Sequence, residues 1–198
     1  MTDITRLRDF VIAATKVIDQ PGQDEAALLA AITPLVADLV AVDDWLPEDY
    51  AKPDPRYYRQ YLLHADPLER LSVVSFVWGP GQRTPIHDHR VWGVVGILRG
   101  AELSVSYSQD AQGHLVAEPA QVLEPGAVAT VSPTIGDIHT IANALPDRPS
   151  ISIHVYGGNI GAIHRSAFDA ASGTEKPFIS GYSSTAIPNL GDRSKDGV

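Results

Sequence analysis

The stretch GQRTPIHDHRVWGVVGILRG, residues 81–100, decides which fold this sequence predicts. At its centre, one residue separates His87 from His89, so in an extended segment both imidazoles project to the same side. Two side chains placed in this way can bind one metal ion from adjacent positions. Any third ligand must come from elsewhere in the chain, and the remaining histidines are His64, His114, His139, His154 and His164. Solvated surface histidines can show the same spacing, so the flanking residues have to separate the two interpretations.

Glycines flank the histidine pair at fixed distances. Five residues separate Gly81 from His87, three separate His89 from Gly93, and six separate Gly93 from Gly100. This spacing resembles the first conserved motif of the cupin superfamily, with Gly93 where many cupins carry a glutamate ligand. The second cupin motif is matched by Gly126, Gly136, His139 and Asn143, with its proline displaced to Pro133. The resemblance implies a mainly β protein with a cupin-type β-barrel, also called a double-stranded β-helix or jelly roll.

The chain on both sides of this stretch fits such a barrel preceded by helices. Short β-rich runs separated by Gly, Pro, Asp and Asn predict strands at 71–78, 91–98, 102–107, 113–117, 120–124, 127–131 and 149–156. Apolar spacing predicts a helix over 3–18. A second helix, capped by Asp24 and kinked or broken at Pro34, should run to about Val40, with a short helix around Glu48. We expect one domain: N-terminal helices over about 1–55, the barrel over about 56–176, and a C-terminal extension over about 177–198 that wraps the surface or frays.

Composition excludes several classes of protein. The 198 residues contain no cysteine, so disulfides, thiolate metal ligands and a cysteine nucleophile are excluded. The net charge is −9 and no Lys/Arg cluster is present, which argues against a nucleic-acid partner. No apolar run reaches the roughly 18 residues of a membrane span. The charged N-terminus lacks the apolar region of a signal peptide, so we expect a cytoplasmic protein; the oligomeric state stays open.

The glycine at position 93 has a chemical consequence. With three histidines and no carboxylate, a bound divalent metal keeps its full dipositive charge. Such a site favours an anionic, soft ligand that comes from the substrate itself. A thiolate fits that description.

Four segments resemble the cysteine dioxygenase family of thiol dioxygenases over roughly residues 55–168. They are Trp78–Gly81, Pro85–His89, Val91–Gly93 and Ser152–Asn159. The resemblance implies that His87, His89 and His139 bind one iron(II) ion per chain, and that dioxygen adds both its atoms to the sulfur of a small thiol to give a sulfinic acid. Imidazole ligands alone would also suit zinc, copper or nickel, so the expectation of iron rests on the resemblance.

Three polar residues lie at alternate positions of one predicted strand. Ser152, His154 and Tyr156 should therefore share one face of it. They could be an ordinary inward-pointing polar row, but the resemblance implies a hydrogen-bonded relay that holds the Tyr156 hydroxyl beside the metal. Mammalian members of the family join this tyrosine to a cysteine, a crosslink that cannot form in a chain without cysteine.

Two positions bear on the choice of thiol. Arg165 matches the position at which bacterial 3-mercaptopropionate dioxygenases hold the substrate carboxylate, and Gln60 should point inward in the register that best matches that branch. This favours 3-mercaptopropionate. A shift of one residue would put Arg59 in the pocket and favour cysteine. Two other hypotheses remain: a metal-binding cupin with different chemistry, and a non-catalytic cupin sensor of small molecules.

Overall fold

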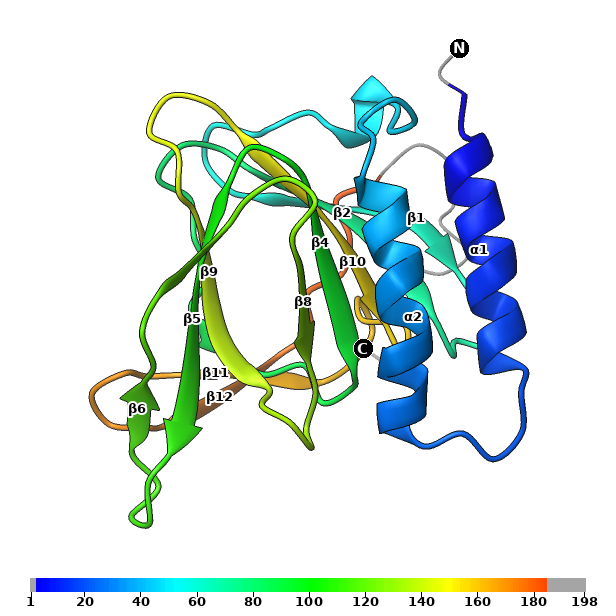
Figure 1. Cartoon of the computed structure of the whole chain (residues 1–198). Coiled ribbons are helices and arrows are strands. Elements are labelled where there is room, and N and C mark those ends of the chain that lie inside the picture. The colour runs from blue at the N-terminus through cyan, green and yellow to red at the C-terminus, as the bar shows by residue number, and fades with distance from the viewer. Residues whose placement is uncertain (1–2, 185–198) are drawn as a thin grey trace.

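The computed structural model describes residues 3–184 as two helices packed against a barrel of two antiparallel sheets (Figure 1). One sheet has the order β1-β2-β10-β4-β8 and the other the order β12-β11-β3-β9-β5-β6, with β7 paired to β5. The strands are β1 Arg59–Ala65, β2 Ser72–Trp78, β3 Ile86–His87, β4 Gly93–Arg99, β5 Glu102–Gln109, β6 Leu115–Ala117, β7 Gln121–Leu123, β8 Val128–Val131, β9 Ile138–Asn143, β10 Ser150–Tyr156, β11 Arg165–Phe168 and β12 Glu175–Phe178. The predicted fold class, mainly β with a double-stranded barrel after N-terminal helices, is confirmed.

The helices α1, Thr5–Ile18, and α2, Glu25–Val40, cover the outer face of the five-stranded sheet (Figure 1). A short 3₁₀ helix, η1, spans Glu48–Tyr50. The Asp24 side chain caps α2 by accepting a hydrogen bond from the Ala27 N–H at 2.8 Å, as predicted. Of the kink or break expected at Pro34, the break was wrong, because α2 continues through that residue. Its buried face, including Ile32 and Val36, packs on the sheet and holds the helix together.

The central strands of the five-stranded sheet are buried on both faces and divide two cores. Their outward side chains, such as Val77, Ile151 and Ile153, pack against the helices. The alternate residues point into the barrel, where Phe76 and Trp78 form a second core. The polar row on β10 therefore faces the barrel interior. The inside of the barrel, between the two sheets, is where a site can form.

The C-terminal part of the described chain returns to the barrel instead of leaving it. After β12, residues 179–184 run along β1, which is an edge strand of its sheet. The N–H groups of Gln60 and Leu62 donate to the hydroxyls of Ser183 and Ser184 at 3.1 and 3.0 Å. Of the predicted extension over about 177–198, residues 185–198 lie outside the described residues. Within residues 3–184, neither helix combines the length and the apolar character needed to cross a bilayer.

Candidate metal centre

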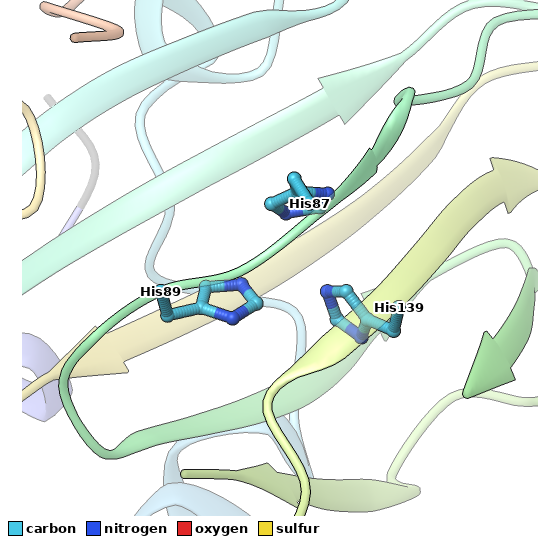
Figure 2. A group of neighbouring side chains, drawn as sticks. All are labelled: His87, His89 and His139. Carbon is cyan, nitrogen blue, oxygen red and sulfur yellow. The ribbon is translucent and has the colours of Figure 1, made fainter. Parts of the chain in front are cut away.

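Three buried histidines converge inside the barrel. His87 lies on β3 and faces His139 of β9 as its cross-strand partner, while His89 follows two residues after His87, just beyond the strand. One ligand atom from each of the three lies within 4.8 Å of the other two, and their rings gather around a common space (Figure 2). Of the histidines that could have supplied a third member, His139 joins the cluster. His64, His114 and His164 lie outside it.

Two of the rings are oriented by hydrogen bonds on the side away from the cluster. Nδ1 of His87 lies 3.1 Å from the carbonyl oxygen of Pro85, and Nδ1 of His89 lies 2.9 Å from Oδ1 of Asp137. Within the described chain, the buried Nε2 of His89 has no hydrogen-bond partner. Such an outer hydrogen bond sets the tautomer and leaves the inner nitrogen with its lone pair free for a metal.

The charge of the cluster also suits a metal ion. Burial lowers the pKa of His87 and of His139 well below the ordinary value, so both imidazoles are neutral at pH 7. Neutral imidazole is the form that binds a metal. Two neutral rings, together with the unpartnered buried Nε2 of His89, therefore fit a divalent transition metal, and imidazole alone does not select which one.

Asp137 was not predicted from the sequence, yet it holds His89 through several contacts. Its Oδ1 accepts from the backbone N–H of His89 at 3.0 Å as well as meeting the ring, and its Oδ2 accepts from the Arg90 N–H at 2.9 Å. Hydrogen bonds from His89 and Arg90 lower the pKa of Asp137, although burial opposes them. A signal was present, because Asp137 precedes His139 by two residues in the second motif, but spacing does not reveal that it reaches His89.

Tyr156 occupies the space beside Gly93 where a longer side chain would enter the centre. A Cβ at Gly93 would lie 2.8 Å from Cδ1 and 2.9 Å from Cε1 of Tyr156. The tyrosine ring also stacks on His89, with ring centroids 5.5 Å apart. The absence of a carboxylate at position 93 is therefore tied to the presence of this tyrosine. A side chain at position 93 would fit only if the Tyr156 ring moved.

The polar row on β10 forms a continuous chain of hydrogen bonds. Ser152 Oγ lies 2.8 Å from Nε2 of His154, and Nδ1 of His154 lies 2.8 Å from the hydroxyl of Tyr156. All three residues are buried. Burial lowers the pKa of His154 well below its usual value and raises that of Tyr156, so both are neutral at pH 7. A neutral chain of this kind can orient a proton at the tyrosine without carrying a charge.

The histidines form one wall of a cavity of about 270 Å³. Its lining includes Tyr58, Gln60, Trp78, Thr84, Tyr156, Arg165, Lys176, Phe178 and Ser180. No carboxylate lines this cavity among the described residues, whereas two cationic side chains do. A bound anion would therefore meet attraction from Arg165 and Lys176.

Arg165 is a buried cation in this cavity. It is 4% exposed, and its Nη2 donates to Ser180 Oγ at 2.7 Å. Its guanidinium carbon lies 4.7 Å from the ring centroid of Phe178. Burial lowers its pKa, but a guanidinium stays protonated at neutral pH. Its Nε has no partner in residues 3–184, so a ligand anion could complete its hydrogen bonds.

Gln60 and Arg59, the two residues of β1 that could enter the cavity, lie on opposite sides of the strand. Gln60 lines the cavity, and its Nε2 lies 3.5 Å from the carbonyl of Ser180. Arg59 points away and pairs with Asp54. Phe178 and Ser180 were not singled out in the sequence, because the segment after β11 has no periodicity that predicts a cavity wall.

Comparisons with known proteins agree with this geometry. The family model described as cysteine dioxygenase type I matches residues 25–170. Human cysteine dioxygenase type 1 is 26% identical over 127 residues, which are 63% of this chain and 62% of the human protein. The chain thus covers less than two thirds of that relative's length.

The solved structures that match this chain are more distant in sequence. An uncharacterized conserved protein with a double-stranded β-helix domain from Klebsiella pneumoniae is 22% identical, with 58% of this chain and 89% of that chain covered and a TM-score of 0.43. A cupin superfamily protein from Desulfitobacterium hafniense is 15% identical, with 61% and 85% covered and a TM-score of 0.40. The family match carries the assignment, because it spans most of the chain and includes the histidine cluster, the β10 row and Arg165. This chain belongs to the cysteine dioxygenase type I family.

Proposed function

We propose that this protein is a non-haem iron(II) thiol dioxygenase that converts a small thiol acid and dioxygen into the sulfinic acid, with 3-mercaptopropionate as the favoured substrate. The observation that carries the proposal is the pairing of two features in one cavity. Three buried imidazoles line one side, and the buried Arg165, which forms no ion pair with a carboxylate of residues 3–184, lines the other. Membership of the family supports the oxidoreductase class.

The proposed metal ligands are His87, His89 and His139. Iron(II) held there would supply the redox chemistry that dioxygen needs and a position for the substrate sulfur. The protein supplies orientation. Asp137 fixes the ring of His89, and the β10 row fixes the hydroxyl of Tyr156.

The charge distribution in the cavity supports a thiol with a carboxylate and no amine. A carboxylate can accept from Arg165, whose bond to Ser180 keeps the guanidinium in place. Gln60 offers only neutral hydrogen bonds. The ammonium group of cysteine would meet Arg165 and Lys176 without any carboxylate on the described lining to offset them. Burying an unpaired charge in this way is unfavourable, so cysteine is the weaker candidate.

Two other functions compete. Cysteine dioxygenase activity would require the amine to bind in its neutral form, and would therefore improve as pH rises. A non-catalytic metal-binding sensor would need neither the Tyr156 hydroxyl nor its hydrogen-bonded row. The buried and fully connected row favours catalysis over sensing.

The test is to load the metal-free protein with iron(II) and follow oxygen uptake and product mass with 3-mercaptopropionate, cysteine and cysteamine in parallel. We expect the highest kcat/KM for 3-mercaptopropionate at pH 7, a gain for cysteine at higher pH, and poor turnover of cysteamine. Arg165→Ala should raise KM for 3-mercaptopropionate strongly, while the exposed Arg148→Ala serves as the matched control. Equal efficiency for cysteine and 3-mercaptopropionate would refute the substrate assignment. Absence of sulfinic acid with every thiol would refute the enzyme class.

A further inference from the structure

A carboxyl group that the proposed mechanism does not use lies beside the β10 row. Glu102, the first residue of β5, is 0% exposed. Neither of its oxygens makes a hydrogen bond of good geometry with a described residue, and the nearby Ser150 Oγ also lacks a partner. The polar groups next to the carboxyl are the hydroxyls of Ser152 and Ser150 and the indole N–H of Trp78. A buried carboxyl that is poorly satisfied costs free energy, so its presence calls for an explanation other than packing.

Ser152 connects this carboxyl to the row. The indole Nε1–H of Trp78 can only donate, and it donates to Ser152 Oγ at 3.3 Å. Ser152 has one hydroxyl proton, which can go either to Nε2 of His154, at 2.8 Å, or to the Glu102 carboxyl. His154 is neutral and carries a single ring proton. If Ser152 donates to Nε2 of His154, the ring proton must be on Nδ1. If Ser152 donates to Glu102, Nε2 can carry the ring proton and donate to Ser152.

Two proton arrangements follow. When Glu102 is protonated, Ser152 donates to Nε2 of His154, Nδ1–H donates to the oxygen of Tyr156, and the tyrosine O–H is free to donate into the cavity. When Glu102 is ionised, it is the stronger acceptor and takes the Ser152 proton. Nε2–H of His154 then donates to Ser152, and Tyr156 donates to Nδ1, so its proton turns away from the cavity.

We propose that Glu102 is a positioning residue whose protonation state sets the proton direction along Ser152, His154 and Tyr156, and thereby whether Tyr156 donates a hydrogen bond into the cavity. The proton switch stands on the hydrogen bonds of the row and on the buried carboxyl of Glu102 beside Ser152, and it requires no catalytic activity. Its consequence for turnover rests on the proposed function.

The surroundings of Glu102 favour its neutral form. Burial is the main cause that raises the pKa of this carboxyl, to about 8, and Ser152, Ser150 and Trp78 oppose it. Within residues 3–184, no charged side chain is among the groups that shift the pKa of Glu102.

The strands packed around Glu102 carry few ionisable groups. β2 and β7 carry none. β9 carries His139 and β10 carries His154 and Tyr156, all neutral, while Arg99 at the end of β4 pairs with Asp43. The carboxyl is therefore protonated at pH 7 and ionises above about pH 8.

The direct test reads the tautomer of His154 by NMR in the full chain labelled with ¹⁵N-histidine and loaded with diamagnetic zinc. In the wild-type protein we expect Nδ1–H below the titration of Glu102 and Nε2–H above it. Glu102→Gln, which cannot ionise, should hold Nδ1–H at every pH. Glu118→Gln, an exposed position, should behave as wild type. Glu102→Leu, which has neither an ionisable group nor an acceptor, gives the same expected result should the glutamine variant fold poorly.

Kinetics give an independent measurement. Wild-type kcat should fall about tenfold for each pH unit above the titration, and Glu102→Gln should lose this alkaline limb with KM little changed. A single His154 tautomer across the pH range in wild type, or a switch that persists in Glu102→Gln, would overturn the proposal. If the tautomer switches but no thiol is oxidised, the proposed function fails and the positioning role of Glu102 remains.

Discussion

Replacing Gly93 by alanine tests whether Tyr156 excludes a side chain at that position. The new Cβ would lie 2.8 Å from Cδ1 of the tyrosine, so the ring must move by about 1 Å to reach a normal carbon–carbon contact. That movement would stretch the 2.8 Å hydrogen bond between Tyr156 and His154. Overpacking of this size destabilises a core by about 1–3 kcal/mol. We expect a loss in that range together with a lower kcat.

A double-mutant cycle isolates the cause. Tyr156→Val removes both ring atoms that clash, so Gly93→Ala should be less destabilising in that background, with a coupling energy of about 1 kcal/mol or more. Urea unfolding of the metal-free variants measures each free energy. Gly96→Ala on the same strand is the matched control, because its Cβ would lie 2.8 Å from Val36 and Val40 and far from the tyrosine. Additive effects for Gly93→Ala and Tyr156→Val, within about 0.5 kcal/mol, would refute the steric argument.

Three further predictions follow from other contacts. Asp137→Asn should weaken metal affinity about 10- to 100-fold, because it loosens the orientation of His89; a metal titration that matches wild type would contradict this. Tyr156→Phe should retain the metal and slow turnover about 10- to 100-fold. An unchanged kcat would mean that the polar row on β10 has no role in turnover. Asp66, whose pKa the Arg70 side chain lowers to about 2, should contribute about 1–2 kcal/mol at pH 7, allowing for the partial exposure of Arg70. That contribution is present above pH 4 and disappears as pH falls toward 2, so urea unfolding of Asp66→Asn and wild type should converge in acid.

The sequence predicted the elements whose apolar pattern is strong and missed those whose position depends on partners. The predicted strand at 149–156 is β10, and the predicted helix from Asp24 is α2. Five strands of the described chain were not predicted: β1, β3, β9, β11 and β12. β3 has two residues and β11 and β12 have four each, while β1 and β9, although longer, do not alternate strictly between polar and apolar side chains. They form because the barrel supplies neighbours, as where His87 pairs with His139 across strands.

The candidate site also contains residues that the sequence predicted and residues that it did not. The spacing of His87 and His89 fits two ligands on one side of an extended segment, and the resemblance to the second cupin motif added His139. Asp137, Ser180 and Glu102 were not predicted, because each lies beside a partner that is distant in the sequence: His89, Arg165 and Ser152. Asp137 reaches His89 across 48 positions, and Glu102 reaches Ser152 between the two sheets. These contacts depend on how the strands are arranged in space, and the spacing of residues in the sequence does not reveal that arrangement.

The segment over residues 179–184 joins two properties that are usually separate. It holds Arg165 through Ser180, and it also covers the outer edge of β1, where Ser183 donates its N–H to the carbonyl of Gln60 at 2.8 Å. An uncovered edge strand presents free backbone groups to other chains and invites edge-to-edge aggregation. A change in this segment that re-aims the arginine toward a new substrate would therefore also alter how well the edge is protected. Under the proposed function, substrate selection by Arg165 and protection of the β1 edge therefore depend on the same six residues, and directed evolution of this segment would have to select for both at once.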